Sequence, residues 1–347
     1  MKLTYLLLGA YATLAVALPH PAPVEEEYDD DIEEIEACPA PIPTSHSTTS
    51  VATHPATSKT THASTTVVST VVPSATVPAK HSSGGNPFTS NGVKAGLSGY
   101  PAIGRTAPAA MSAYSEYIGW YSDYTPITPD IGNVQGIPML WGDGDTCTSS
   151  TDVTERVAEF EKAIQTSTPK MMFGFYEPDC NCPMSSDMSD PVVGAQKWNS
   201  MLAPLASRGT VLGSPSMCRQ SAESWLTPFK NAGLHADWEV TSIHVNVANL
   251  AGVQKDVEYY AAKYGKPIWV SEFACVHAGN GFFNPCTDQG EIDNFINTVV
   301  PWLEANKTVV AYGASNGAGL GSTWPLISGG KLTHTGNTYL NALKNLK

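Results

Sequence analysis

The sequence lacks any long apolar run beyond its N-terminus. The one such run, LTYLLLGAYATLAV at residues 3–16, is shorter than the roughly 20 residues that cross a bilayer. It follows Lys2 and ends near the small residues AVA, which is the pattern of a secretory signal peptide over residues 1–17. The C-terminus, NALKNLK, has no apolar tail of the kind found in a lipid-anchor signal. We therefore expect a secreted protein, extracellular or in a cell wall, without a membrane span.

Positive charge is also scarce, with 19 Lys and Arg against 32 Asp and Glu. Nine of the acidic residues lie in residues 25–36, which leaves 23 acids and 16 bases in residues 87–347. No basic stripe appears, so nucleic acid is excluded as a partner. The glycine-rich segments GNGFF and GAGLG lack the lysine or the strand–helix frame of a phosphate site, so no nucleotide cofactor is expected.

Metal-binding patterns are missing as well. The segment CNC has no matching CxxC or HxxxH, which favours disulfides over a metal site. Asp143 and Asp145 stand beside glycines in WGDGD, where aspartates are typical of turns. We predict no metal and no cofactor.

The N-terminal quarter has the composition of an unfolded chain. Residues 18–43 form an acidic, proline-containing segment that we expect to be disordered. Residues 44–83 contain 20 Ser and Thr and no Asp or Glu, so residues 44–89 are interpreted as an O-glycosylated linker. The single structured domain is then residues 90–347, with a possible glycan at the sequon Asn306-Lys307-Thr308.

Seven cysteines in a secreted chain indicate disulfides with one cysteine left over. Cys38 stands apart in the N-terminal region. The other six lie in the structured part: Cys147, Cys180, Cys182, Cys218, Cys275 and Cys286. Their connectivity is not fixed by sequence, but Cys275 and Cys286 bracket one loop and are the first pair that we expect.

Within the domain, short apolar runs alternate with helix-like stretches. The predicted strands are residues 93–99, 117–122, 137–142, 170–176, 210–216, 240–246, 266–273 and 308–315. Amphipathic patterns predict helices at residues 150–166 and 250–265, the second ended by Gly265. Eight strands that alternate with helices favour an α/β fold, a (β/α)8 TIM barrel behind the disordered linker.

Glu177 raises a specific question, because it ends the apolar run MMFGFY and precedes Pro178. A buried strand that stops at a proline would place Glu177 at the C-terminal rim of the barrel. A helix N-terminus with Pro178 at its first position is the alternative. Glu272 repeats the pattern after the apolar run PIWV, and its alternative is a surface carboxylate.

If both strand assignments hold, Glu177 ends the fourth strand and Glu272 the seventh. Two carboxylates that face each other across a barrel mouth are what cleavage of a glycosidic bond requires. One donates a proton to the leaving oxygen, and the other attacks or stabilises the anomeric carbon. Mutual repulsion and burial keep one of them protonated.

Sugar rings stack on aromatic side chains, and several fall at predicted C-terminal strand ends. They are Trp120, Tyr121, Trp141, Tyr312 and Trp324. Each alone could be a core residue, but we expect two or three of them to bind sugar, Trp141 foremost. His244, at the end of the sixth strand, is either a core histidine or a hydrogen-bond partner of the nucleophile or of a sugar hydroxyl.

The segments IPMLWG, GFYEPD, PIWVSEFA and GKLTHTGNTYLNAL resemble the fungal glycoside hydrolase family 128, the alkali-sensitive-linkage-like β-1,3-glucanases. The resemblance implies a TIM barrel and retaining hydrolysis of β-1,3-glucan, with Glu177 as acid/base and Glu272 as nucleophile. The wider clan usually has Asn before the acid/base, where it helps to hold the sugar's 2-hydroxyl; this sequence has Tyr176, which we include among the substrate-binding residues.

The sequence thus predicts a secreted, monomeric endo-β-1,3-glucanase that acts on cell-wall β-1,3-glucan and its oligosaccharides. Two alternatives stay open. One is a glucan-binding protein on the same barrel with weak or no hydrolysis, and the other is a structural wall glycoprotein whose linker is the functional part.

Overall fold

The computed structural model describes residues 86–100, 109–144, 151–218, 220, 222–279, 282–316 and 319–347. The predicted signal peptide, the acidic segment and the linker up to residue 85 lie outside these residues. Asn86 and Thr89, which the sequence placed in the linker, are buried. Asn86 Oδ1 accepts a hydrogen bond from the backbone N–H of Phe88, which packs against the barrel core. The folded part therefore begins no later than Asn86.

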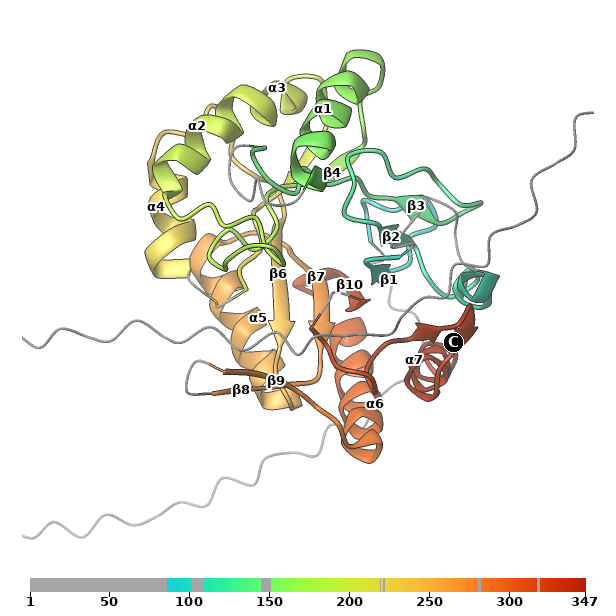
Figure 1. Cartoon of the computed structure of the whole chain (residues 1–347). Coiled ribbons are helices and arrows are strands. Elements are labelled where there is room, and N and C mark those ends of the chain that lie inside the picture. Colours follow the sequence, from blue (N-terminus) through green and yellow to red (C-terminus); the bar gives the residue numbers. More distant parts are fainter. Residues whose placement is uncertain are drawn as a thin grey trace, which may run out of the picture. The chain divides into compact units, whose positions relative to one another are not determined.

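Eight parallel strands form the centre of the domain (Figure 1). They are β1 (Ala95–Ser98), β2 (Trp120–Ser122), β3 (Gln135–Gly136), β4 (Met171–Phe173), β5 (Val211–Gly213), β6 (Thr241–Asn246), β7 (Ile268–Ala274) and β10 (Val309–Ser315). Six pair in the order β3-β2-β1-β10-β7-β6, and β4 pairs with β5. Parallel bridges from Met139 to Phe173 and from Gly213 to Val240 join the two sheets on both sides, so the strands close into a barrel.

Seven of the eight predicted strands overlap an observed strand. The prediction at residues 137–142 is the exception, since regular pairing there is confined to Gln135–Gly136 and the bridge at Met139. Pro138 is the physical reason: it has no N–H to donate, although its carbonyl accepts from Phe173. The predicted TIM-barrel fold is confirmed.

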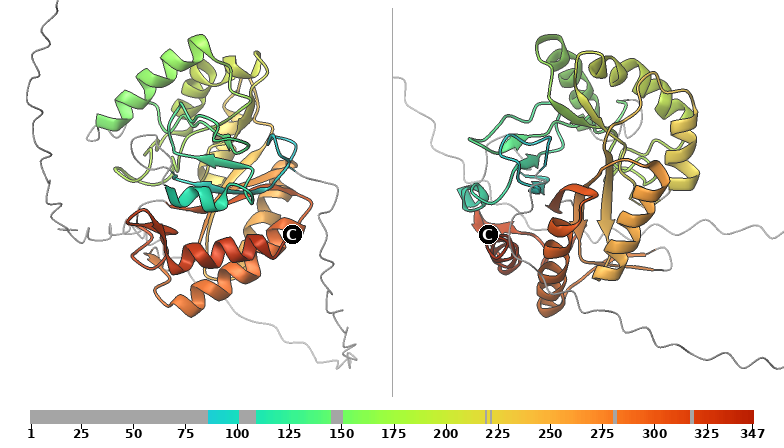
Figure 2. Two further views of the ribbon diagram at one scale, coloured as in Figure 1. Left: turned by 90° about the vertical axis from the view of Figure 1, so that its right-hand side faces the viewer. Right: turned by 180° about the vertical axis from the view of Figure 1, so that it is seen from behind.

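The helices lie outside the strands and form an arc from α1 to α6 (Figure 1). They are α1 (Thr151–Thr166), α2 (Pro191–Met201), α3 (Ala203–Ala206), α4 (Thr227–Asn231), α5 (Leu250–Tyr264), α6 (Gln289–Ala305) and α7 (His334–Lys344), with a 3-10 helix η1 (Ala109–Tyr114) and a π-helical turn η2 (Ala222–Leu226). Both views of Figure 2 show α7 beside α6. Antiparallel hairpins are formed by β8 (Val276–Gly279) with β9 (Phe282–Pro285) and by β11 (Ile327–Ser328) with β12 (Lys331–Leu332).

Both predicted helices are present, as α1 and α5. The side chain of Asn249 caps the start of α5 by accepting from the N–H of Gly252, and Gly265 ends the helix with a left-handed φ of 65°. None of the helices in the described segments is long and apolar enough to cross a membrane.

Aromatic side chains fill the barrel interior. Trp120, Phe173 and Trp269 are buried and meet edge to face, with ring centroids 5.0–5.9 Å apart. Gly96 makes room for Trp120, because a Cβ at that position would lie 2.2 Å from the indole Cε2. The interior is therefore a packed core rather than a channel, and any ligand has to bind at one end of it.

Disulfides join several of the loops. Cys275 and Cys286 are bonded, as predicted, and clip the ends of the β8–β9 hairpin. Cys180 is bonded to Cys218, and Cys182 is disulfide-bonded as well. Cys38 and Cys147 lie outside the described residues.

Candidate active site

Glu177 lies at the C-terminal rim of the barrel, just beyond β4. The backbone N–H of Tyr176 donates to Trp141 O, and that of Glu177 donates to Ser216 O, both at 2.9 Å, so the residues after β4 still bridge the neighbouring chain segments. Glu177 then turns with φ 47°, and no helix begins before Pro191. The strand-end interpretation is confirmed, and the helix N-terminus is excluded.

Glu272 lies within β7, near its C-terminal end. Against β6, Ile243 pairs with Val270 while His244 pairs with Glu272, so β7 contains one residue more than β6 between these pairs. The register against β10 shifts in the same part of β7. Such a bulge changes the direction of a side chain. Here it sets Glu272 against His244.

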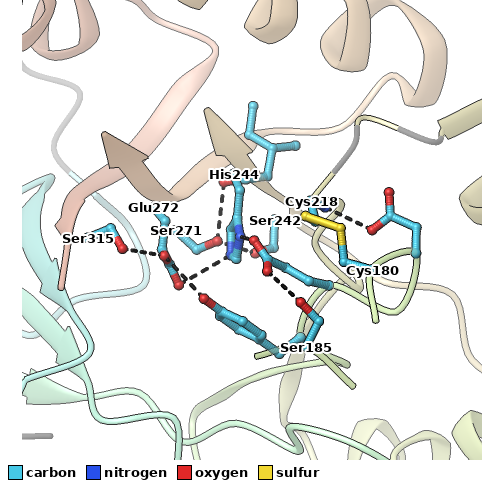
Figure 3. A network of polar contacts seen from close by, with 12 residues as sticks. Cys180, Ser185, Cys218, Ser242, His244, Ser271, Glu272 and Ser315 are labelled. Atoms are coloured by element: carbon cyan, nitrogen blue, oxygen red, sulfur yellow. Dashed lines mark hydrogen bonds and ion pairs between the residues drawn. A yellow bond between two sulfur atoms is a disulfide. The ribbon is translucent and has the colours of Figure 1, made fainter. Parts of the chain in front are cut away.

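His244 connects the two glutamates; Figure 3 labels it together with Glu272. Its Nδ1 lies 2.7 Å from Glu177 Oε1, and its Nε2 lies 3.5 Å from Glu272 Oε1. The exposed fraction of the residue is 0% for His244, 3% for Glu272 and 8% for Glu177. We call these three residues the Glu–His–Glu triad. The two carboxylates expected to meet across the barrel mouth are thus linked through one imidazole.

Hydroxyl groups bind the remaining carboxylate oxygens. Ser185 Oγ donates to Glu177 Oε2 at 2.9 Å, and Ser315 Oγ donates to Glu272 Oε2 at 2.5 Å. Tyr176 places its hydroxyl 3.5 Å from the same Glu272 oxygen. Each carboxylate therefore has one oxygen toward His244 and the other toward a serine, which fixes its orientation.

Glu272 and His244 retain protons more firmly than isolated side chains would. Burial raises the pKa of Glu272; the charge of His244 opposes this rise, and Glu177 adds to it. Burial alone would lower the pKa of His244, but Glu272 and then Glu177 raise it above its ordinary value of 6.5. Burial also raises the pKa of the Tyr176 phenol well above its ordinary range, and both glutamates add to that. Proton transfer is the chemistry that such a group can support.

The chain resembles known proteins along most of its folded part. The family model for the glycosyl hydrolase catalytic core matches residues 99–339. A crystal structure of a GH128 subgroup VII oligosaccharide-binding protein from Trichoderma gamsii has 40% identity and a TM-score of 0.67, covering 75% of this chain and 96% of that one. Its counterpart from Cryptococcus neoformans has 39% identity and a TM-score of 0.67, covering 76% and 99%. The chain belongs to glycoside hydrolase family 128.

More distant relatives bear on the fold and on the extent of the match. A GH128 subgroup II endo-β-1,3-glucanase from Sorangium cellulosum has 24% identity and a TM-score of 0.54 over 72% of this chain and 98% of its own, and shares the fold. Alkali-sensitive linkage protein 1 of Schizosaccharomyces pombe is 28% identical over 178 residues. That match spans 49% of this chain and 32% of the relative, so the chain corresponds to about a third of that protein's length.

Four of the predicted sugar-binding aromatics are core residues of this family 128 barrel. They are Trp120, Tyr121, Tyr312 and Trp324, each at most 1% exposed. The polar atom of each donates a hydrogen bond to another protein group, which leaves none of them available to a ligand. The expectation that two or three of the five stack on sugar is corrected accordingly: Trp120 begins β2 and Tyr312 lies in the middle of β10, so neither is at a C-terminal strand end, and all four rings are buried.

Trp141 is 7% exposed and lies beside the triad. Its ring stacks with Tyr176 at a centroid distance of 6.0 Å and an interplanar angle of 15°, and the Arg156 guanidinium lies 5.1 Å from its centroid. Tyr176 also contacts His244, with ring centroids 5.1 Å apart. The two predicted residues thus form one stack that borders the triad, with little of the indole surface open to solvent.

Among the described residues, Cys275, Cys286 and Glu291 bring three potential metal ligands within 4.8 Å of one another. The two sulfurs are joined in a disulfide, so neither can act as a thiolate ligand. Of the two aspartates considered for a cation, Asp143 is buried and Asp145 lies outside the described residues.

Sequence reasoning missed the two serines that hold the carboxylates. Ser315 ends the last predicted strand, so the strand-end rule that found the glutamates could have found it. Ser185 lies in the irregular segment between Glu177 and α2, where no periodicity marks it. Tyr124, whose ring centroid lies 5.0 Å from that of Tyr176, was also missed.

Proposed function

We propose that this protein is a retaining glycoside hydrolase that cleaves β-1,3-glucan in the barrel mouth, with Glu177 as acid/base and Glu272 as nucleophile. One observation carries the proposal: two buried carboxylates, Glu177 in the turn after β4 and Glu272 within β7, converge on a single histidine. Binding of a neutral sugar does not require such a pair, whereas glycosidic cleavage does.

In the first step, Glu272 attacks the anomeric carbon while Glu177 gives a proton to the leaving oxygen. A water molecule then attacks the anomeric carbon while Glu177 takes its proton, the bond from that carbon to Glu272 breaks, and the sugar leaves with its β configuration restored. The contact at 2.7 Å makes His244 the group that holds Glu177 in place and shares its proton. The hydrogen bond from Ser315 holds the attacking carboxylate in one orientation.

The substrate class follows from the family, which includes an endo-β-1,3-glucanase with the same fold. The place of action that we propose is extracellular, in a cell wall, since three disulfide-bonded loops are typical of proteins that fold in an oxidising compartment.

Asn306 of the predicted glycan site is half-buried at the end of α6, and its side-chain oxygen accepts a hydrogen bond from the backbone N–H of Thr308.

Oligosaccharide binding without turnover is the second candidate. Two relatives with 39–40% identity are oligosaccharide-binding proteins. A geometric observation agrees with it: the Tyr176 phenol occupies the space between Trp141 and His244 and reaches within 3.5 Å of Glu272. A sugar has to pass this ring, or displace it, before Glu272 can attack.

Incubation of the secreted protein with laminaripentaose separates the two candidates. Hydrolysis gives shortened products, and proton NMR should show the β-anomer before the α-anomer appears by mutarotation. An early α-anomer would contradict the retaining mechanism. Heat of binding on titration without any products would reject hydrolysis and favour the binding role.

A further inference from the structure

The turn that carries Glu177 has several contacts with one neighbouring segment, residues 216–218. Glu177 N donates to Ser216 O at 2.9 Å, and Cys218 N donates to Asp179 Oδ1 at 2.8 Å. A disulfide joins Cys180 to Cys218, with the two Cα atoms 6.0 Å apart. Figure 3 shows this disulfide in one view with His244 and Glu272. The turn and the segment after β5 are therefore fastened together within a few residues of the catalytic carboxylate.

These contacts hold Glu177 in an unusual backbone conformation. Glu177 has φ 47°, a left-handed conformation that residues with a Cβ rarely adopt. Such a conformation persists only where its surroundings impose it. The hydrogen bond from Cys180 N to Glu177 O lies inside the turn and moves with it, so it cannot impose the position of the turn.

Gln220, two residues beyond this segment, contacts the strand of the triad's histidine. Gln220 Nε2 donates to the backbone carbonyl of His244 at 2.6 Å. The segment after β5 thus contacts both the turn of Glu177 and the strand of His244. A displacement of this segment would change the contact between the two side chains, which is 2.7 Å long here.

We propose that the Cys180–Cys218 disulfide, with Asp179, is a positioning element that holds Glu177 in its acid/base geometry. The effect on catalysis that we infer rests on the proposed function, whereas the effect of the disulfide on the position of Glu177 does not. The barrel is closed by its own strand pairing, so the disulfide is not required to form the fold. Its loss should displace one side chain rather than unfold the domain.

The test is the double variant Cys180→Ala/Cys218→Ala of the full chain, with Cys275→Ala/Cys286→Ala as the matched control. Both variants lose one disulfide and should melt at a lower temperature. For laminaripentaose, kcat of the first variant should fall on the order of 10²-fold with KM nearly unchanged, as expected for a misplaced catalytic group. The control should keep kcat within about twofold, because Glu272 is held by strand pairing on both sides.

A substrate whose leaving group needs no proton shows whether the loss of kcat comes from impaired proton donation by Glu177. In 2,4-dinitrophenyl β-laminaribioside the leaving phenolate needs no proton, so formation of the glycosyl-enzyme should survive in the first variant. Equal losses on both substrates, or an unchanged kcat on laminaripentaose, would overturn the inference. Asp179→Ala keeps the disulfide and should show the same pattern to a smaller degree, which provides a second variant if the first does not fold.

A readout without turnover separates this inference from the proposed function. The ring nitrogens of His244, identified in ¹⁵N NMR spectra by their loss in His244→Gln, report its contact with Glu177. In the first variant the pKa of His244 should fall, because one of the carboxylates that raise it has moved away; in the control it should not change. If the wild-type protein cleaves neither substrate, the proposed hydrolysis fails; an unchanged His244 titration in the first variant would reject the positioning role.

Discussion

Glu177 and Glu272 meet at one histidine, but the chain holds them by different means. Glu272 lies inside β7, which pairs with β6 on one side and β10 on the other. Glu177 lies beyond the last regular residue of β4, in a turn with a left-handed φ of 47°. Glu272 takes its position from the backbone of three paired strands. The position of Glu177 depends on side-chain contacts and, as we propose, on a disulfide.

The difference predicts that Glu272 keeps its position when residues around it are substituted and that Glu177 does not. A residue within a paired strand moves only if the sheet moves, and the central strands are the most stable part of a barrel. A residue in a turn moves if any of its few anchors is lost. Variants of Glu272, the proposed nucleophile, should therefore change only the chemical step, whereas variants near Glu177, the proposed acid/base, should change both the chemical step and the position of the carboxylate.

The largest effect should come from Glu272→Gln. The amide keeps the shape of the side chain but cannot attack the anomeric carbon, so kcat should fall on the order of 10⁴-fold or more. Binding of laminaripentaose, measured by calorimetry, should stay within a few fold of the wild type, since the strand keeps its place. Full activity in this variant would remove Glu272 from the mechanism.

Glu177→Gln should have the next largest effect and should depend on the substrate. Loss of a general acid costs roughly 10²–10⁴-fold when the leaving group needs a proton. Activity on laminaripentaose should fall by that amount, while the burst of dinitrophenolate from the aryl laminaribioside should remain. A burst lost together with the glucan activity would show that the variant disturbs more than proton donation.

Much of this fold was predictable because hydrophobic periodicity reports burial directly. β7 and β10 are buried at nearly every residue, and the sequence shows them as largely apolar runs, whereas β6 is equally buried but has only Ile243 and Val245 as apolar residues. The strand near residues 137–142 was misplaced, since Pro138 interrupts its pairing while its neighbours remain apolar. Local sequence patterns locate a strand well when every residue of the apolar run has a backbone N–H that can donate a hydrogen bond to a neighbouring strand.

The site was predictable only as far as its residues end strands. Glu177 and Glu272 follow apolar runs, His244 lies in the second half of β6, and the parallel order brings the C-terminal parts of such strands together. The rule failed for Trp120 and Tyr312, because Trp120 begins β2 and Tyr312 lies in the middle of β10, where both rings pack inside the protein. Ser185 came from a loop whose path depends on tertiary contacts.

His244→Gln should have a smaller effect on rate than either glutamate variant, and it should change how stability depends on pH. In the wild type, the folded-state pKa values of His244 and Glu272 both lie above their ordinary values. The folded state therefore binds more protons than the unfolded state, and stability should fall as pH rises through the window above 6.5 in which His244 titrates.

Melting temperatures of both proteins between about pH 5 and 9 check this. The variant should be less stable than the wild type by on the order of 3 kcal/mol at the acidic end, where it lacks the buried imidazolium. The gap should shrink toward alkaline pH as the wild type loses its proton. A gap that is constant with pH would mean that His244 contributes packing rather than charge.

The smallest effects should come from two matched hydroxyl deletions, Ser315→Ala and Ser185→Ala. Each removes one hydrogen bond to a buried carboxylate, and both serines are nearly fully buried. A hydrogen bond to a charged group contributes about 1.5–3 kcal/mol, so each variant should lose roughly tenfold or somewhat more in kcat.

The two serine variants should differ in how their loss of kcat depends on the substrate. Ser315→Ala leaves Glu272 in its strand, so it should slow laminaripentaose and the dinitrophenyl glycoside to the same degree. Ser185→Ala removes an anchor from the turn, so its effect should be confined to laminaripentaose, the substrate whose leaving group needs the proton of Glu177. Identical substrate profiles for the two variants would mean that the strand and the turn hold their carboxylates equally firmly, because only a displaced acid/base discriminates between the leaving groups.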